Sequence, residues 1–275
     1  MSDPAAGSGG AGTQRALRLL AIEAATEGLS VAVFEGGRVV AEREARSARQ
    51  HAASLLAIVD ETLRAAGIGL PEIEAMAISA GPGSFTSLRI SLATLKGLCF
   101  GRSIPVVGVS TLETIAMGAG EAARAQASAS AAGAAGEGGP EVLALLDARR
   151  GEWYAGAWRI PAAPDALPQP TLIEGLYAPA TLVLDLPRAV FVAAPEPGAC
   201  AVFAAAGLVQ AGVLEEKAAH PRAAIVGRLA LPRLARGEGQ TAAALTARYL
   251  RRAEAEARRT GQAVEAGETA RTGPL

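Results

Sequence analysis

Residues 80–86 read A-G-P-G-S-F-T and lie between two segments of different character. The preceding run, E-A-M-A-I-S at 74–79, is short and mostly apolar, which is typical of a buried strand. The following run, S-L-R-I-S-L-A-T-L-K-G-L-C-F at 87–100, repeats its leucines at helical spacing. The stretch is therefore a strand-to-helix turn. Such turns either hold an anion at the helix N-terminus or only reverse the chain.

The candidates for ligand binding at this turn are Gly81, Gly83 and Thr86. The glycines would let the backbone approach a phosphate closely, and the hydroxyl of Thr86 or Ser84 would cap the helix. The spacing fits neither the G-x-x-x-x-G-K-[ST] phosphate loop nor the G-x-G-x-x-G dinucleotide fingerprint. Spacing alone leaves both interpretations open: a ligand cradle, or a tight turn with a hydroxyl cap.

The segments around this turn follow an order that predicts the fold class. The expected elements are strands at 17–24, 30–35 and 38–45, a helix at 50–66, a strand at 75–80, helices at 86–100 and 110–125 around a strand at 104–109, strands at 142–148 and 152–159, and a helix at 221–236. This order is that of an α/β protein with two ribonuclease H-like lobes of the actin, sugar-kinase and Hsp70 (ASKHA) class. Proteins of this class bind nucleotide between their lobes.

Composition divides the chain into parts. The stretch A-S-A-S-A-A-G-A-A-G-E-G-G-P at 127–140 is of low complexity and predicts a flexible loop. The expected parts are a disordered tail at 1–15, an N-terminal ribonuclease H-like lobe at 16–126, this loop at 127–140, a second lobe at 141–252 and a charged tail at 253–275.

The overall composition is that of a packed globular protein. The 275 residues carry a formal net charge of −1 and 50% of them are apolar, but no run of 18 apolar residues occurs. Cys99 and Cys200 have apolar neighbours and lie in no C-x-x-C pair, which predicts buried free thiols in a reducing setting. We therefore expect a cytoplasmic protein with no membrane partner.

Several short blocks of the sequence form a recognisable set. They are I-E-A-A-T at 22–26, G-P-G-S-F-T-S-L-R-I at 81–90, K-G-L at 96–98, P-V-V-G-V-S-T-L at 105–112, L-D-A-R-R-G-E-W-Y at 146–154 and Y-L-R at 249–251. Together they resemble the bacterial TsaB (YeaZ) family over residues 17–252. The G-P-G-S-F-T block followed by G-V-S-T-L is the most specific part of this resemblance.

The resemblance implies an accessory dimerisation subunit. Such a subunit binds the TsaD transferase and supports the transfer of threonylcarbamoyl to the adenosine next to the anticodon in tRNA, which is t(6)A formation. The implied partners are TsaD in a heterodimer, TsaE in a larger complex, and tRNA through that complex. Whether the free protein is a homodimer stays open.

The resemblance also bears on catalysis. The catalytic paralogue, TsaD, carries H-x-x-x-H after the strand that corresponds to 104–109, and those histidines hold a metal ion. Aligned on G-V, this chain has Thr111 and Ile115 at the two positions. Isoleucine cannot ligate a metal, and threonine is a poor replacement for imidazole. We therefore expect a non-catalytic subunit with no catalytic residue, no metal and no cofactor.

Two alternatives are weighed against this function. A nucleotide-binding ATPase or kinase-like protein of the same fold would use Glu23, Gly81, Gly83 and Thr86. In nucleotide-binding relatives the acid at the end of the first strand helps to hold magnesium through water, but the family usually has Asp-Thr-Ala-Thr where this chain has Glu23-Ala24-Ala25-Thr26. Ser87 also replaces a family glycine, and its side chain would crowd a phosphate. An M22-type glycoprotease is the least favoured alternative, because neither a metal motif nor a catalytic triad is visible.

Protein contacts are the function that remains. The helices at 50–66 and 86–100 are apolar over more than one face, whereas a helix that packs only on a sheet needs one apolar stripe. In the family these helices pack against their counterparts in TsaD or in a second TsaB copy. The implied interface candidates are Leu55, Ile58, Val59, Leu88 and Leu92, and the alternative for each is core packing. The arginine-rich stretch at 248–259 either contacts tRNA phosphates or forms a solvated helix end.

Overall fold

The computed structural model describes residues 16–46, 51–129, 139–163, 166–186, 190–214 and 216–251. The expected tails at 1–15 and 253–275 lie outside the described residues, and so does most of the low-complexity segment at 127–140. The first residues of that segment are the end of a helix, which runs to Ala129.

The first lobe is built on one mixed sheet. Within the described residues it has five strands in the order β3-β2-β1-β4-β5. They are β1 (Arg18–Glu23), β2 (Gly28–Glu35), β3 (Arg38–Arg46), β4 (Ala75–Gly81) and β5 (Val106–Ser110). Strands β1 to β3 pair antiparallel, whereas β4 and β5 run parallel to β1. The helices of this part are α1 (His51–Ala66), α2 (Phe85–Leu98) and α3 (Thr111–Ala129), with a short 3-10 turn at Leu70–Glu72.

The second lobe repeats this arrangement. Its sheet has the order β10-β9-β6-β7-β8, in which β6 to β8 pair antiparallel and β9 and β10 run parallel to β6. The strands are β6 (Glu141–Asp147), β7 (Trp153–Arg159), β8 (Gln169–Tyr177), β9 (Val190–Ala193) and β10 (Gln210–Val213), and the helices are α4 (Pro179–Asp185), α5 (Ala199–Ala205), α6 (Glu216–Ala219) and α7 (Ala223–Ala235). The repeated topology confirms the expected fold class of two ribonuclease H-like lobes.

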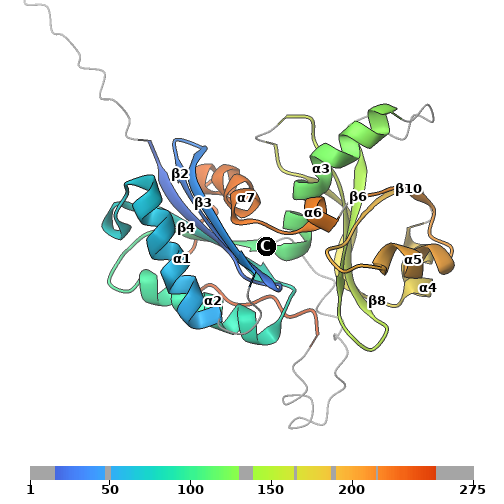
Figure 1. Ribbon diagram of the computed structural model, residues 1–275, viewed down its shortest axis with the longest axis horizontal. Coiled ribbons are helices and arrows are strands. Elements are labelled where there is room, and N and C mark those ends of the chain that lie inside the picture. The colour runs from blue at the N-terminus through green and yellow to red at the C-terminus, as the bar shows by residue number, and fades with distance from the viewer. Residues whose placement is uncertain are drawn as a thin grey trace, which may run out of the picture.

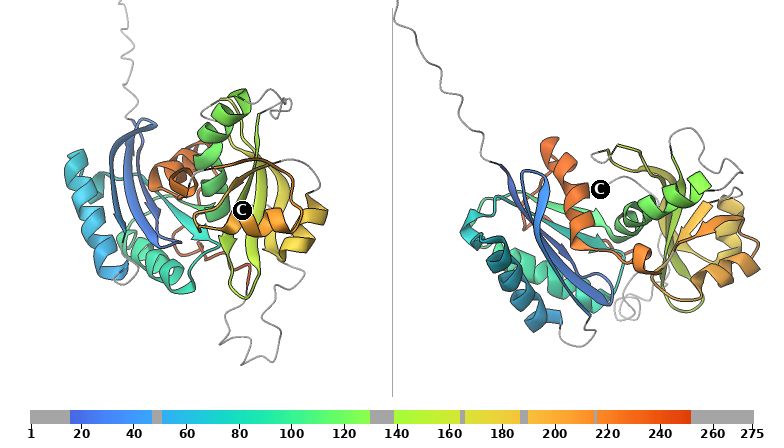
Figure 2. Two further views of the ribbon diagram at one scale, coloured as in Figure 1. Left: turned by 45° about the vertical axis from the view of Figure 1, so that its right-hand side comes forward. Right: turned by 45° about the horizontal axis from the view of Figure 1, so that its top comes forward.

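The elements form five layers (Figures 1 and 2). Helices α1 and α2 cover the outer face of the first sheet, α3 and α7 lie between the sheets, and α4 and α5 cover the outer face of the second sheet. Successive side chains of a strand point to opposite faces of the sheet, so each strand contributes apolar side chains to the core on either side of it. In β1, Leu19 and Ala21 point to the central core, while Leu20 and Ile22 point to the core under α1 and α2.

Helix α7 corrects one expected domain boundary. It follows the second sheet in sequence but packs on β1, β2, β4 and β5 of the first sheet. The contact is close, because a Cβ atom built on Gly227 would lie 2.1 Å from the ring of Phe34. The amide of Ala223 also donates to Ser30 Oγ at 2.8 Å. Residues 223–247 therefore return to the first lobe, because the inner face of its sheet needs an apolar cover, and 141–252 is not one unit.

Two further expectations concern the thiols and the membrane. Cys99 is a buried free thiol as expected, whereas Cys200 is only partly buried. Within the part of the chain that the structure describes, no helix is long and apolar enough to cross a membrane.

Candidate functional site

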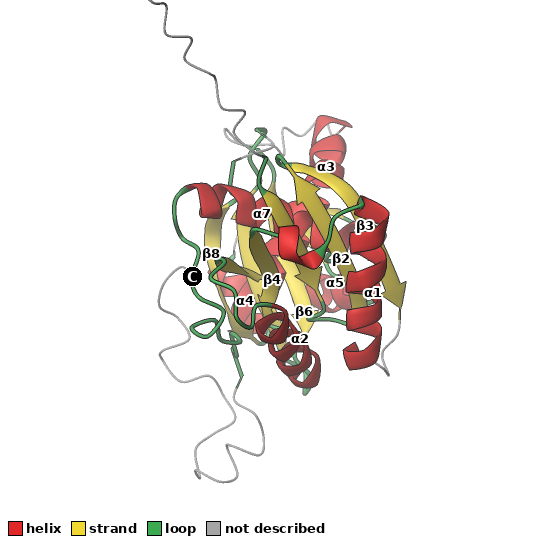
Figure 3. Ribbon diagram, turned by 90° about the vertical axis from the view of Figure 1, so that its left-hand side faces the viewer, coloured by secondary structure: helices red, strands yellow, loops and turns green. Residues whose placement is uncertain are grey.

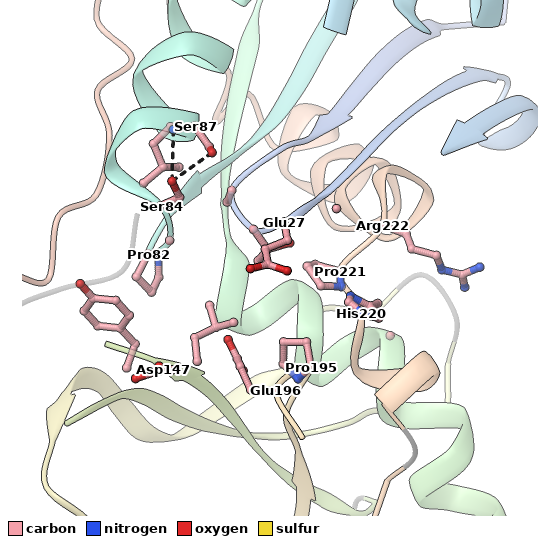
Figure 4. A pocket seen from close by; sticks show the side chains of 18 of the residues that line it. Glu27, Pro82, Ser84, Ser87, Asp147, Pro195, Glu196, His220, Pro221 and Arg222 are labelled. Carbon is pink, nitrogen blue, oxygen red and sulfur yellow. Dashed lines mark hydrogen bonds between the residues drawn. The ribbon is translucent and has the colours of Figure 1, made fainter. Parts of the chain in front are cut away.

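A cleft of about 1520 Å³ lies between the two lobes. The first lobe lines it with the turn after β1, the loop that precedes α2 and the loop that precedes α7. The second lobe lines it with the segments that follow β6 and β9. In Figure 4, Glu27, Pro82 and Ser84 lie across the cleft from Asp147 and Glu196.

Pro82, Gly83 and Ser84 of the glycine loop line the cleft, but both glycines of the loop also pack against other backbone segments of this chain. A Cβ atom on Gly83 would lie 2.2 Å from the carbonyl oxygen of Ala25, and one on Gly81 would lie 2.6 Å from that of Arg248. Gly81 also has a φ of +114°, a conformation that L side chains rarely adopt. Both glycines are therefore needed because other backbone segments of this chain approach the loop.

Two amides at this turn bond to backbone carbonyls of the same chain. The amide of Ser84 donates to the carbonyl of Ala25 at 2.8 Å, and that of Leu88 donates to the carbonyl of Ser84 at 2.9 Å. Ser84 is the N-cap of α2 and accepts from the Ser87 amide at 3.4 Å and the Ser87 hydroxyl at 3.0 Å. Thr86, the other candidate cap, is exposed and does not line the cleft. The loop is a capped strand-to-helix turn.

Glu23 is buried beneath this loop. Its side chain is 0% exposed and accepts hydrogen bonds from the Ser79 hydroxyl and from the amide of Ala25, the latter at 2.9 Å. Burial raises the pKa of Glu23 to about 7, while the bonds from Ser79 and from the amides of Ala25 and Thr26 oppose the increase. Because it does not line the cleft, Glu23 is not placed to hold magnesium through water.

Of the four expected cofactor residues, only Gly83 reaches the cleft wall. Glu23, Gly81 and Thr86 do not line it, and the amide of Ser84 donates to the carbonyl of Ala25. These residues do not fit a nucleotide with its magnesium ion. The four residues are close in sequence, but the structure does not gather them on one surface of the cleft.

Sequence reasoning missed the acidic wall of the second lobe. Asp147 ends β6 and Glu196 follows β9, so the parallel pairing of the two strands brings both carboxylates to one edge. Asp147 accepts from the amide of Arg149 at 2.7 Å and pairs with its guanidinium at 3.2 Å. Burial raises the pKa of Glu196, and the nearby Asp147 adds to this effect. Among the described atoms, Glu196 Oε2 is buried without a hydrogen-bond partner.

The five expected interface residues lie in the interior of the first lobe. Leu55, Ile58, Val59, Leu88 and Leu92 are each at most 7% exposed, and all but Leu88 belong to the core under α1 and α2. Their burial corrects the expectation that these side chains contact a partner. Leu56 on α1 is 52% exposed and lies on the outer side instead.

The two positions that correspond to metal ligands in the paralogue are also core positions. Thr111 and Ile115 are both 0% exposed, and Ile115 packs in the central core between the sheets. Among the described residues, no three His, Cys, Asp or Glu side chains are grouped to hold a metal ion. The first turns of α3 therefore serve packing between the lobes.

The described part of the arginine-rich stretch is engaged within the protein. Arg248 pairs with Glu174 at 2.8 Å, and Arg251 contacts Glu152 and the carbonyl of Ala148. These two arginines are therefore held by the second lobe rather than presented to phosphates. The remaining arginines of 248–259 lie outside the described residues.

Comparisons with known proteins agree with this architecture. The family model for TsaD, tRNA N6-adenosine threonylcarbamoyltransferase, matches residues 39–258. A solved structure, YeaZ from Pseudomonas aeruginosa, aligns with a TM-score of 0.69 at 27% identity and covers 85% of this chain and 100% of that one.

Curated relatives match a shorter part of the chain. The tRNA threonylcarbamoyladenosine biosynthesis protein TsaB of Escherichia coli K12 is 40% identical over 138 residues, which are 50% of this chain and 53% of that protein. The protein of the same name from Haemophilus influenzae is 35% identical over 138 residues, or 50% and 52% of the two chains. The chain thus spans about half the length of the curated relatives it matches.

Proposed function

This chain belongs to the TsaB (YeaZ) branch of the family whose model it matches, and we propose that it is a non-catalytic accessory subunit in t(6)A synthesis. In this proposal it binds the TsaD transferase in the cytoplasm and supports threonylcarbamoyl transfer to the adenosine next to the tRNA anticodon. TsaE joins the same complex, and tRNA is contacted through it.

The observation that carries the proposal is the burial of the two residues that replace the metal-binding histidines of the transferase. Thr111 and Ile115 stand where the transferase has its histidines, and both are fully buried in this chain. A threonine and an isoleucine in a packed core supply no ligand for a catalytic metal. The glycine loop supports the same conclusion for the phosphate cradle, because the carbonyl of Ala25 occupies the space beside Gly83.

A partner would bind on the outer face of the first lobe. Helices α1 and α2 lie side by side on this face (Figure 3). We define the partner face by its exposed residues, which are Leu56, Ala57, Asp60, Glu61 and Arg64 of α1 and Thr86, Arg89, Ala93 and Gly97 of α2. Its small and apolar members would form the centre of an interface and its charged members the rim.

Size-exclusion chromatography with light scattering tests the partner. The purified chain is mixed with TsaD, and we expect a one-to-one complex that replaces any homodimer. Leu56→Glu puts a charge on the partner face and should weaken the complex about tenfold or more. Leu184→Glu is the matched control, because Leu184 is 79% exposed on α4 of the other lobe. Equal affinities of the two variants for TsaD would show that α1 is not part of the interface.

A transfer assay tests the activity. TsaD, TsaE, ATP, threonylcarbamoyl-AMP and tRNA are incubated with and without this chain, and modified adenosine is measured. We expect modification only when the chain is present. Full modification in its absence would reject the accessory role.

The cleft supports one second candidate, a nucleotide-binding ATPase or kinase-like protein. The observation in favour of this candidate is the volume of the cleft between the lobes, which is about 1520 Å³. Calorimetric titration of the lone protein with ATP and magnesium tests it directly. A substitution of Gly83 would not, because any side chain there collides with the carbonyl of Ala25 whether or not nucleotide binds. Tight ATP binding by the lone protein would favour this candidate.

A further inference from the structure

The last described residues cross from one lobe to the other. We call residues 240–251 the C-terminal strap. It begins at the edge of the first sheet, where Gln240 and Val106 exchange backbone hydrogen bonds of 2.8 and 2.9 Å. Leu245 of the strap lies in the core under α1 and α2, and Gly108 of β5 leaves room for it. The strap is therefore part of the support beneath α2.

The strap contacts α2 at both ends of the helix. Near the C-terminal end, Lys96 Nζ donates to the carbonyl of Ala243 at 3.4 Å. At the N-terminal end, the ring of Tyr249 lies 5.2 Å from that of Phe85. Arg89 covers Phe85 at 3.8 Å and its Nε donates to the Tyr249 hydroxyl at 3.4 Å. These three side chains join the first turn of α2 to the strap.

Neighbouring residues of the strap are held by the second lobe. The guanidinium of Arg248 lies 2.8 Å from the carboxylate of Glu174 on β8, and that carboxylate is 8% exposed. Two residues past Tyr249, Arg251 contacts Glu152 and Ala148 at the turn between β6 and β7. Arg248 also donates its amide to the Ala80 carbonyl at 2.7 Å, at the start of the glycine loop. The two lobes thus hold the strap at adjacent residues.

We propose that the C-terminal strap couples the position of the second lobe to the first turn of α2, and so to the partner face. Arg248 and Tyr249 are adjacent, and one binds the second lobe while the other binds α2. A shift of the second lobe therefore pulls on Arg248, and the adjacent Tyr249 passes the displacement to Phe85 and Arg89. The link to a partner rests on the proposed function, whereas the link between lobe and helix does not.

The charge distribution explains why the second lobe holds the strap firmly. Glu174 faces Arg248, with Ser110, Glu113 and Arg233 close enough to influence its ionisation. This group joins α3, α7 and β5 to β8 and the strap. Removing one member leaves its partner charged in a site with little water, which is costly. A change on β8 is therefore felt at α2 without any direct contact between the two.

Amide hydrogen exchange of the free protein tests the coupling. Glu174→Gln alters the second-lobe side of the strap and Tyr249→Leu alters the α2 side. The reporters are the amides of Ser84 and Leu88, compared with the amides of strand β1. In both variants we expect the two reporters to exchange about tenfold faster, relative to β1, than in the unaltered protein.

The control is Glu35→Gln. It breaks an ion pair with Arg18 of the same 2.8 Å length that does not touch the strap. It should leave the exchange of Ser84 and Leu88 unchanged. If either strap variant leaves the reporters unchanged, or accelerates all amides of the first lobe equally, the coupling is rejected. If Glu174→Gln does not fold, Glu152→Gln takes its place, because it removes the second-lobe partner of Arg251.

Affinity for TsaD gives the second measurement. We expect Glu174→Gln to weaken binding about tenfold although residue 174 lies on the other lobe, and Glu35→Gln to have no effect. Failure of the unaltered protein to bind TsaD would reject the proposed function, and the exchange experiment would still decide on the strap. Normal binding by Glu174→Gln together with faster exchange would confine the coupling to the free protein and reject its extension to the partner face.

Discussion

The stability of this protein should fall as the pH rises through neutrality, because of one buried carboxyl. Glu23 is 0% exposed, lies beneath the glycine loop, and has a pKa of about 7 instead of 4.5. A carboxyl whose pKa is higher in the folded protein than in the unfolded chain stabilises the fold in its protonated form. Its contribution is complete below pH 4.5 and is lost as the pH rises through about 7.

The size of the effect follows from the shift. A difference of about 2.5 pKa units at about 1.36 kcal/mol per unit corresponds to about 3.4 kcal/mol between the two limits. According to the linkage relation, about 2.5 kcal/mol of this loss of stability occurs between pH 5 and pH 8. The Ser79 hydroxyl and the Ala25 amide both bond to the carboxyl oxygens, and these bonds keep the shift from being larger.

Urea denaturation of the unaltered protein and of Glu23→Gln, measured from pH 5 to 8, isolates this group. All other titrating groups are shared, so their slopes cancel in the difference. Glutamine resembles the protonated carboxyl, so the stability advantage of the unaltered protein over the variant should fall by about 2.5 kcal/mol over this range. Parallel pH curves for the two proteins would refute the raised pKa and the burial on which it depends.

Two further predictions concern packing and charge. Glu113→Gln disrupts an ion pair in which Arg233 Nη2 lies 2.8 Å from both carboxylate oxygens. By calorimetry we expect the free energy of unfolding to fall by about 3 kcal/mol and the Tm by roughly 10 °C. Replacing both Glu113 and Arg233 with leucine should restore most of this stability. An unchanged Tm in Glu113→Gln would contradict the pairing. Gly83→Ala should lower the free energy of unfolding, measured by urea denaturation, by about 1–3 kcal/mol, because the added Cβ would lie 2.2 Å from the Ala25 carbonyl oxygen. Gly97→Ala in α2 has open space and should stabilise by about 0.5–1 kcal/mol, so equal effects of the two would refute the close approach.

The first half of the fold could be predicted from the sequence because its elements are long and strongly patterned. The strand expected at 17–24 is β1 at Arg18–Glu23, and the helix expected at 86–100 is α2 at Phe85–Leu98. The segment from 160 to 218 gave no such signal. Its strands β9 and β10 have four residues each, too few for a period of two to be recognised, and the nine residues of β8 show no regular alternation of buried and exposed positions.

The error over the interface residues has a geometric cause. A helix on a sheet needs one apolar stripe, and the wider apolar arc of α1 predicted a second, exposed contact. Helix α1 packs against β2 and β3 and also against α2, so its own lobe covers the wider arc. Leu55, Ile58 and Val59 are buried for this reason, whereas Leu56 is 52% exposed on the outside. Sequence periodicity measures how wide the apolar arc is but not what covers it.

The acidic wall of the cleft could not be predicted for a different reason. Asp147 and Glu196 are separated in sequence by a stretch with weak signals, and only the parallel pairing of β6 with β9 brings them together. The L-D-A-R-R-G-E-W-Y block contained Asp147, but nothing in the block indicates its partner across the sheet. Pairing between strands that are distant in sequence is a property of the sheet, which single-segment patterns do not contain.

The glycine loop can now be understood from its contacts. In a nucleotide cradle, glycines keep the backbone open to a ligand, whereas here the space beside Gly83 is filled by the carbonyl of Ala25 and that beside Gly81 by Arg248. The acid at the end of the first strand bonds to Ser79 and to the turn of which Ala25 is part, instead of facing the cleft. Both glycines and the buried acid thus contact other parts of this chain. The combined effect is to fix the start of α2 between the first strand and the strap, which is what a helix needs if its outer side is to be recognised by another protein.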